Sequence, residues 1–439
     1  MRVYLDTVGC RLNQSEIEKL AANFRAGGHE IVASAAEADI VVINTCAVTA
    51  EAASDSRQKI RQAARQGAGQ IIATGCWATL EPTAAAALPG VSRVVSNADK
   101  MRLVADLTGM PVFDLEPLAR EPLPGLHRRT RAFIKVQDGC DNFCTFCITR
   151  IARGKGRSES IENVIRDVQA AVAGGAKEVV LSGVHLGSWG YDLHPPRHLR
   201  HLIEAILMET DVPRVRLSSL EPWDLDETFF RLWENPRMCR HLHLPLQSGC
   251  AQTLRRMARK ITPEGYAALL EQARVMIPGL AVTTDIIVGF PGESEAEFEV
   301  SLAFVEAMAF AGGHVFAYSP RPGTAAARLP NHVSPEVKKE RSRRMREVLA
   351  KASLRFRQAF MGQVVNVLWE TVDGKGPQGW RLRGLSDNYI HVEAFAPEPW
   401  WNEIHSVRLI EISSQGMMGQ ILEQGLSSDG TIKTLVRGD

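Results

Sequence analysis

Three cysteines share one short loop in the stretch Gly139-Cys140-Asp141-Asn142-Phe143-Cys144-Thr145-Phe146-Cys147, with C-x3-C-x2-C spacing. Cysteine thiolates hold iron–sulfur clusters, and a four-iron cluster normally takes four of them. Because this loop offers three, we expect one iron to keep an open coordination position, as in catalytic rather than structural metal sites. A zinc knuckle without its fourth ligand and buried structural cysteines are the alternatives, and both fit the flanking pattern less well.

The residues after this loop alternate between strand and helix patterns, which predicts six βα units and an incomplete (β/α) barrel. The expected strands are Phe133–Val136, Glu178–Leu181, Arg214–Leu217, His241–Leu244, Ala281–Val288 and His314–Tyr318. The expected helices are Ile161–Ala173, Leu199–Thr210, Asp224–Trp233, Gln252–Arg259, Pro263–Ile277 and Glu293–Ala311. Active sites of such barrels lie at the carboxyl ends of the strands, and the cysteine loop follows the first strand. S-adenosylmethionine (SAM) can fill an open iron position and be cleaved reductively, which is radical chemistry.

The other strand ends of this region carry glycine, serine and one acidic residue. Gly183 allows close approach of a ligand to the backbone, and Glu221 could accept hydrogen bonds from ribose hydroxyls. Ordinary turn chemistry explains such residues equally well at each single position. Taken together, they fit a barrel mouth that accommodates SAM.

The amino-terminal third shows the same strand–helix alternation, which predicts a parallel sheet covered by helices. The expected strands are Val3–Leu5, Ile40–Ile43 and Gln70–Ala73, and the expected helices are Asn13–Ala26, Ala50–Gln66 and Ala98–Leu107. One cysteine follows each strand: Cys10, Cys46 and Cys76. Because ligands bind at the carboxyl ends of parallel strands, we expect these thiols to meet and hold a second cluster. Ordinary buried cysteines are the alternative.

The carboxyl-terminal part consists of short strand patterns separated by turns, typical of a small barrel that resembles an OB fold. The expected strands are Val364–Trp369, Trp380–Leu385, Tyr389–Val392, Ser406–Ile412 and Met417–Leu422. Barrels of this kind often bind RNA. Arg381 and Arg383, with Trp369 and Trp380, are candidates for a local RNA-binding patch.

Bulk composition narrows the classes of protein. The chain has 439 residues, 45% hydrophobic and 23% charged, with a formal net charge of +1, so any contact with nucleic acid must use local patches. Eight cysteines without a leader pattern favour a reducing, cytoplasmic setting over a disulfide scaffold. The sequence shows no apolar run of membrane-spanning length.

Basic residues flank the cluster loop and recur on one expected helix. They are His127, Arg128, Arg129, Arg131, Arg150, Arg153, Lys155 and Arg157, and then Lys338, Lys339, Arg341, Arg343, Arg344 and Arg346. A solvated helix face and a grip on phosphates both explain the second group.

With these features assembled, the chain resembles the radical-SAM methylthiotransferase family over nearly its full length. Its branch that acts on threonylcarbamoyladenosine in tRNA is the most similar. The segments that carry this likeness are Gly9–Glu16, Ile43–Thr49, Ser56–Gln58, Arg216–Pro222 and Tyr318–Thr324. The resemblance implies an α/β multidomain fold with three parts: an amino-terminal cluster domain (1–112), a radical-SAM barrel (126–352) and a terminal TRAM barrel (360–427).

The resemblance also implies the chemistry. Cys140, Cys144 and Cys147 would bind one [4Fe–4S] cluster on which SAM is cleaved, with Phe146, Gly183, Ser219 and Glu221 beside SAM. Cys10, Cys46 and Cys76 would hold a second cluster that carries the sulfur to be methylated and transferred to C2 of the adenosine at tRNA position 37. That carbon bears an unreactive C–H bond, so a radical initiator is needed. The reductant would be a protein such as flavodoxin or ferredoxin.

Two alternatives share this chemistry: methylthiolation of N6-isopentenyladenosine in tRNA, and methylthiolation of a ribosomal-protein aspartate. A third, from another class, is a non-catalytic iron–sulfur protein that binds RNA. The sequence departs from the family at one point: Ile148-Thr149-Arg150 lacks the usual proline after the third barrel cysteine. Since proline would fix the backbone there, the shape of this loop is the feature that the departure affects.

Overall fold

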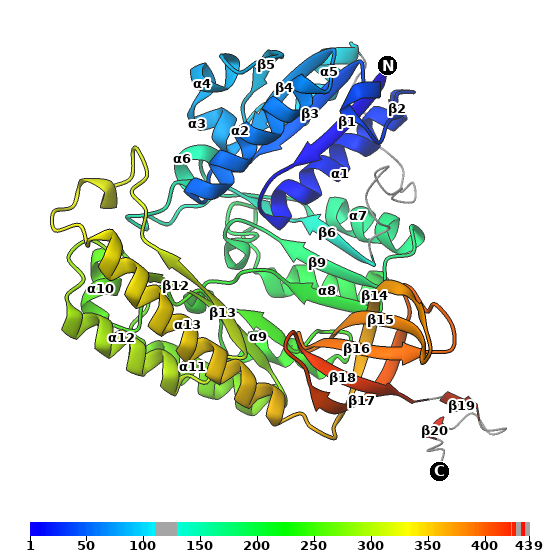
Figure 1. Cartoon of the computed structure of the whole chain (residues 1–439), viewed down its shortest axis with the longest axis vertical. Helices are drawn as coiled ribbons and strands as arrows, with labels where there is room; N and C mark the ends of the chain where they lie inside the picture. The colour runs from blue at the N-terminus through cyan, green and yellow to red at the C-terminus, as the bar shows by residue number, and fades with distance from the viewer. Residues whose placement is uncertain (110–129, 423, 427–431, 435–439) are drawn as a thin grey trace.

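The computed structural model describes residues 1–109, 130–422, 424–426 and 432–434. The expected domain limits at residues 112, 126 and 427 lie outside these ranges, as do His127, Arg128 and Arg129. Figure 1 shows the amino-terminal domain above a larger central domain, with the carboxyl-terminal barrel packed against the lower side of the latter. Among the described helices, none combines the length and apolar character needed to cross a bilayer.

The amino-terminal domain is a parallel sheet with strand order β2-β1-β3-β4-β5 and helices on both faces. Its elements are β1 (Arg2–Thr7), α1 (Arg11–Ala26), β2 (Glu30–Ile31), η1 (Ala35–Glu37), β3 (Ile40–Thr45), α2 (Ala50–Arg65), β4 (Gln70–Gly75), α3 (Cys76–Leu80), α4 (Pro82–Ala86), β5 (Val91–Val95), η2 (Lys100–Arg102) and α5 (Leu103–Thr108).

The central strand β3 explains why two faces are covered. Every residue of β3 is buried. Val41 and Ile43 join the core under α2 and α3, whereas Ile40 and Val42 join the core under α1 and α5. Successive side chains of a strand point to opposite faces, so the unbroken apolar run of β3 requires a helix layer on each side.

The central domain contains, within the described residues, six parallel strands in two groups of three, β6-β9-β10 and β11-β12-β13. The bridges between Val215 and Met238 and between Ser219 and His243 connect the two groups. The strands are β6 (Arg131–Lys135), β9 (Glu178–Ser182), β10 (Arg214–Leu217), β11 (His241–His243), β12 (Ala281–Val288) and β13 (Gly312–Ala317), with a small hairpin of β7 (Gln137–Asp138) and β8 (Arg157–Ser158). This confirms the expected incomplete barrel.

Helices cover the outer face of this barrel and share one large apolar core with it. They are α6 (Thr149–Arg153), α7 (Ile161–Ala173), η3 (Leu186–Ser188), α8 (Leu199–Glu209), η4 (Pro222–Asp224), α9 (Glu227–Phe230), η5 (Arg231–Glu234), α10 (Ala251–Arg256), α11 (Pro263–Met276), α12 (Glu295–Ala307), η6 (Ala326–Arg328) and α13 (Pro335–Gln358). The helix expected over Asp224–Trp233 is wrong in length, since α9 changes to a 3-10 turn at Arg231. The helix expected from Glu293 starts later, because Ser294 caps α12 and exchanges hydrogen bonds with Glu297 in a capping box.

The carboxyl-terminal module is a closed barrel with strand order β14-β15-β16-β18-β17, which confirms the expected small all-β barrel. Its strands are β14 (Val364–Gly376), β15 (Gly379–Ser386), β16 (His391–Ala396), β17 (Ile404–Ile412) and β18 (Met417–Ile421), followed by the pair β19 (Gln424–Leu426) and β20 (Ile432–Thr434). Trp369 is fully buried in the core of this barrel, so its suggested part in a surface patch is wrong.

The carboxyl-terminal barrel docks where β9, β10 and β11 begin. Arg216 is fully buried, pairs with Glu178 at 2.6 Å and donates to the backbone oxygens of Ser386 and Asp387. Tyr389 stacks on His241 with ring centroids 4.1 Å apart. Its backbone has a φ of 67°, a left-handed conformation that is unusual for a bulky side chain. The docked module therefore depends on a buried cation and on one strained turn.

Candidate functional site

Cys10, Cys46 and Cys76 lie together at the carboxyl edge of the amino-terminal sheet. Thr45 pairs with Gly75 in the sheet register, so the next residues, Cys46 and Cys76, leave adjacent strands side by side. A side chain at Gly9, which has a φ of 94°, would collide with the Cys46 side chain. Glycine at this position therefore lets the Cys10 loop close over Cys46, and the strand ends bring three distant cysteines to one place.

The surroundings of these three thiols fit a bound group. Burial raises the pKa of the Cys46 thiol to about 11, and the charges of the Cys10 and Cys76 thiolates act in the same direction. The buried Oγ1 of Thr74 and Nε1 of Trp77, on either side of Cys76, lack a hydrogen-bond partner within the described chain. Such groups normally have partners. The residues present thus suit an anionic cluster with polar neighbours.

The barrel cysteines lie in one loop that its own backbone and two neighbouring segments hold. The backbone N–H of Cys140 donates to the oxygen of Gly154, and that of Cys147 donates to the oxygen of Cys144. Thr145 bonds the oxygen of Met257 through its N–H and accepts from the N–H of Ala326. The helix α6 begins at Thr149, directly after the loop, although the proline expected from the resemblance is missing. The loop therefore keeps a regular exit without that residue.

Arg259 lies beside Cys144 and binds the carboxylate of Glu221. Its Nη1 lies 3.7 Å from the Cys144 sulfur, and its two terminal nitrogens donate to Glu221 at 3.0 and 2.6 Å. Its guanidinium also lies 4.6 Å from the Trp223 ring centroid. Burial raises the pKa of Cys144, and the Arg259 cation opposes this shift. Glu221 is thus engaged with an arginine that the sequence did not single out.

A second polar pair supports Cys140. His185 Nε2 lies 2.6 Å from Asp224 Oδ2, while its Nδ1 lies 3.3 Å from the amide of Asn142. Burial lowers the pKa of His185, but hydrogen bonds to Asp224 and to the Cys140 sulfur outweigh that effect and raise it to about 9. Cys140 and Cys144, the first and the middle cysteine of the loop, therefore each have beside them a basic side chain held by a carboxylate.

The remaining predicted SAM contacts lie at the same mouth. Phe146 is half-buried and meets Phe290 edge-on, with ring centroids 6.4 Å apart. Gly183 packs against Gln137, whose Oε1 would lie 3.0 Å from an added Cβ. Ser219 follows β10, beside the unpartnered buried Oγ of Ser218. Gly183 thus lies beside Gln137, which bonds the start of the cysteine loop, whereas Ser219 lies at the carboxyl end of β10; contact of these residues with SAM stays a prediction.

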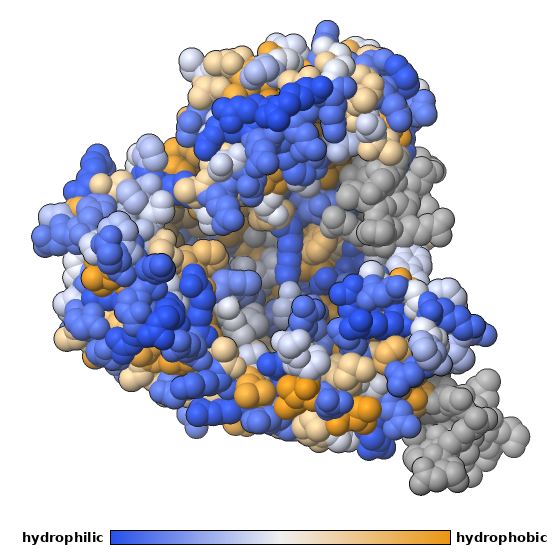
Figure 2. Space-filling view, viewed as in Figure 1, coloured by the Kyte–Doolittle hydropathy of each residue, from blue (hydrophilic) through white to orange (hydrophobic). Residues whose placement is uncertain are grey.

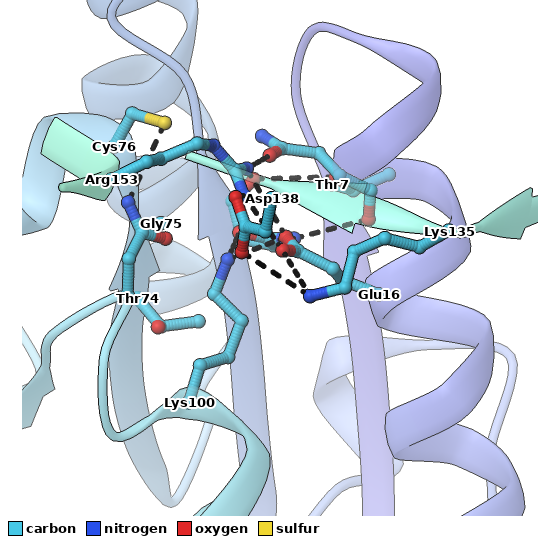
Figure 3. A network of polar contacts seen from close by, with 12 residues as sticks. Thr7, Glu16, Thr74, Gly75, Cys76, Lys100, Lys135, Asp138 and Arg153 are labelled. Carbon is cyan, nitrogen blue, oxygen red and sulfur yellow. Dashed lines mark hydrogen bonds and ion pairs between the residues drawn. The ribbon is translucent and has the colours of Figure 1, made fainter. Parts of the chain in front are cut away.

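A buried network of charges joins the two cysteine groups (Figure 3). Arg153, on α6 after the barrel cysteines, donates to Glu16 on α1 at 2.8 Å and to Asp138 before those cysteines at 3.0 Å. Lys100 donates to Glu16 at 2.6 Å, and the side chains of Arg153 and Lys100 are each 1% exposed. These cations hold the pKa of Glu16 well below its usual range against the opposing effect of burial. The network fixes the barrel loop against the amino-terminal sheet.

Three arginines of the basic group on α13 make ion pairs, as do the two arginines predicted to bind RNA. Arg341 is buried and pairs with Glu293 at 2.8 Å, whereas Arg343 and Arg344 pair with glutamates of α13 and α12. In the carboxyl-terminal barrel, Arg381 pairs with Glu393 and Arg383 with Asp373. Arg341 therefore serves packing and Arg343 and Arg344 serve surface pairing, and the role of Arg381 and Arg383 toward RNA stays a prediction.

No three Cys, His, Asp or Glu side chains of the described residues converge as they would on a single metal ion. A four-iron cluster takes one thiolate at each iron, so its ligands stand farther apart than those of a lone ion. All eight cysteines are free thiols, and the two that belong to neither group, Cys239 and Cys250, are buried. The donor set therefore suits clusters held by Cys10, Cys46 and Cys76 and by Cys140, Cys144 and Cys147.

Comparison with known families and folds agrees with this site. Residues 2–96 match a family described as "Uncharacterized protein family UPF0004", and residues 134–305 match the Radical SAM superfamily. Among solved structures, the chain is similar to the radical S-adenosylmethionine methyltransferase TsrM from Kitasatospora setae, at 16% identity and a TM-score of 0.57, over 74% of this chain and 75% of that one. This likeness shows the fold.

Curated relatives match nearly the whole chain. Threonylcarbamoyladenosine tRNA methylthiotransferase MtaB of Bacillus subtilis is 35% identical over 97% of this chain and 98% of its own, and the protein of that name from Thermotoga maritima is 35% identical over 95% and 96%. A tRNA-2-methylthio-N(6)-dimethylallyladenosine synthase of Caldicellulosiruptor saccharolyticus is 32% identical over 95% and 92%. This chain is an enzyme that belongs to the radical-SAM methylthiotransferase family, with MtaB proteins among its relatives.

Proposed function

We propose that this enzyme transfers a methylthio group to C2 of N6-threonylcarbamoyladenosine at position 37 of tRNA. The observation that carries the proposal is the pair of three-thiol groups on two domains, joined by one buried network. A protein that used its clusters only to hold a fold would close each one with a fourth ligand. Relatives named for threonylcarbamoyladenosine are 33–35% identical to this chain, against 30–32% for those named for dimethylallyladenosine.

The proposed cofactors are SAM and two [4Fe–4S] clusters. When bound, these groups supply the one-electron chemistry that an unreactive aromatic C–H bond requires. Cys140, Cys144 and Cys147 would hold one cluster, and Cys10, Cys46 and Cys76 the other. We also infer that a low-potential protein such as flavodoxin or ferredoxin is the reductant. The cytoplasmic location expected from the unpaired cysteines stays a prediction.

The chain's own residues would orient these groups. Arg259, held by Glu221, places a cation beside Cys144, and His185, held by Asp224, places another beside Cys140. Positive groups next to thiolates favour the ionised form that binds metal. The contact of Phe146 with Phe290 places apolar surface within the cysteine loop.

Two measurements test the proposal. Iron and sulfide analysis after anaerobic reconstitution should give two four-iron clusters for each chain; one cluster, or zinc, contradicts the two-cluster assignment. Nucleosides of tRNA from a deletion strain, with and without the restored gene, are then compared by mass. The methylthio group on threonylcarbamoyladenosine should disappear and return with the gene. Loss of the mark from isopentenyladenosine, or only from a ribosomal protein, would overturn the proposed substrate.

A further inference from the structure

An aromatic ring is exposed inside the barrel's cysteine loop. Phe143, between Cys140 and Cys144, is 72% exposed. The guanidinium carbon of Arg150 lies 3.5 Å from the centroid of its ring, so Arg150 covers one face and leaves the other open. Nη1 of Arg150 is buried and has no hydrogen-bond partner within the described chain. Such a stack of ring and cation at the surface can receive a further planar group.

This ring–guanidinium pair is linked to the other cysteine group through a few contacts. Arg150 lies on α6, which packs against α3, the helix that begins at Cys76. The oxygen of Ala152 on α6 accepts a hydrogen bond of 2.9 Å from Asn97, and the same Asn97 nitrogen lies 3.5 Å from the Cys76 sulfur. In Figure 1, α6 lies where the amino-terminal domain meets the barrel, and Figure 2 shows the surface hollowed between these two parts.

The neighbouring surface is apolar and cationic. Val48, two residues after Cys46, and Ile151 are each about half exposed. Arg321 donates from Nη2 to the oxygen of Val48 at 3.3 Å. The nearby carboxylate of Asp141 is engaged, since it accepts from the N–H of Gly156 at 3.2 Å. A surface with an open ring, aliphatic groups and guanidinium cations suits a base and its phosphate.

We propose that Phe143 and Arg150 form a stacking platform for an unpaired base of the RNA substrate, next to the adenosine that is modified. This inference rests on the proposed function, because it takes the substrate to be an RNA loop. Bases of RNA loops are unstacked and are recognised by stacking on aromatic rings and guanidinium planes. A platform inside the barrel's cysteine loop, linked to the second group of thiols, would hold the RNA loop while both cysteine groups act on one base.

The test measures how tightly the anaerobically reconstituted full-length enzyme binds a fluorescently labelled anticodon stem–loop RNA, by anisotropy at constant salt. Phe143→Ala should weaken binding about tenfold. Phe143→Trp should keep wild-type affinity, whereas Phe143→Leu, apolar but not aromatic, should behave like the alanine variant. Met208→Ala is the matched control, since Met208 is 84% exposed on α8 and should leave the affinity unchanged.

Equal affinities for Phe143→Ala and wild type, or full affinity of Phe143→Leu, would overturn the platform. Iron content is measured for each variant; should Phe143→Ala lose iron, the leucine and tryptophan variants compared at equal iron content decide the matter. Absence of a methylthio product with the expected affinity ratios contradicts the proposed function alone. Product formation with equal affinities contradicts the platform alone.

Discussion

The barrel cysteines lie in one continuous loop, whereas Cys10, Cys46 and Cys76 follow three different strands. The first group owes its geometry to local backbone hydrogen bonds, such as those from Cys140 and Cys147. The second group exists only when β1, β3 and β4 pair in register. A perturbation of packing should therefore damage the amino-terminal group more than the barrel group, and this difference can be tested.

The largest effects are expected for the cysteines themselves. Cys144→Ala should remove both SAM cleavage and methylthio transfer, while Cys46→Ala should remove the transfer but retain SAM cleavage. Each should lower the iron content by about half, because one four-iron cluster is lost. The products are measured by chromatography of 5′-deoxyadenosine and mass analysis of nucleosides. Cys250→Ala, a buried cysteine outside both groups, is the control; full transfer by Cys46→Ala would refute the assignment.

The next effect concerns the network between the two groups. Glu16→Gln leaves the Lys100 cation buried without its carboxylate and Arg153 with Asp138 alone, which should destabilise the protein by about 3 kcal/mol in urea unfolding. Glu293→Gln is the matched variant, since Glu293 pairs with the buried Arg341 in the barrel domain. Both should lose stability, but we expect only Glu16→Gln to lose iron from the amino-terminal group. Equal iron loss in the two variants would contradict the expectation that the amino-terminal cysteine group depends specifically on the packing around Glu16.

The same carboxylate predicts how stability depends on pH. The Lys100, Arg153 and Lys135 cations hold the pKa of Glu16 well below its ordinary value of 4.5, although burial opposes them. A group with a depressed pKa adds stability above its unfolded-state pKa and loses it as the pH falls toward the folded-state pKa. The gap in unfolding free energy between wild type and Glu16→Gln should therefore narrow in acid below about pH 4.5. If this difference in unfolding free energy stays constant in acid, the ionised carboxylate of Glu16 is not what stabilises the wild type.

The sequence predicted much of the fold because apolar runs and strand–helix alternation depend on residues that are close together in the chain. The strands Arg214–Leu217 and Ala281–Val288 have the expected bounds. The meeting of Cys10, Cys46 and Cys76 followed from the rule that parallel strands share their carboxyl edge. The short edge strands β2 and β5 were not foreseen, since β2 has two residues and β5 is largely exposed.

The supports of the site were not predictable in the same way. Arg153 and Glu16 are 137 positions apart, and Arg259 and Cys144 are 115 apart, so no local spacing links them. A signal did exist for Arg153 and Glu16, because both stand near cysteines and carry charge in segments that pack inside. The sequence carries no such signal for Tyr389, because its left-handed backbone and its stack on His241 arise from docking of the carboxyl-terminal barrel.

A smaller effect is expected where the carboxyl-terminal barrel reaches the Cys10 loop. Arg11 donates from Nη2 to the Tyr389 hydroxyl at 2.8 Å. Tyr389→Phe removes this bond and should cost about 1 kcal/mol of unfolding free energy. Tyr191→Phe, at an exposed tyrosine of the barrel domain, should cost nothing measurable. Equal losses of unfolding free energy in the two variants would contradict a stabilising role for the hydrogen bond between Arg11 and Tyr389.

The smallest effect on stability is expected at Arg381 and Arg383. Variants at these positions therefore test RNA binding while both cysteine groups stay intact. Their pairs with Glu393 and Asp373, in which the arginines are about half exposed, should each contribute about 1 kcal/mol or less. If each arginine also meets a phosphate, Arg381→Gln and Arg383→Gln should each lower the slope of log affinity against log salt by about 1. Arg231→Gln, in a more exposed pair with Glu227 in the barrel domain, is the control and should leave that slope unchanged. An unaltered slope in all three variants would mean that the carboxylates retain these arginines, since phosphate must displace an existing partner before it can bind.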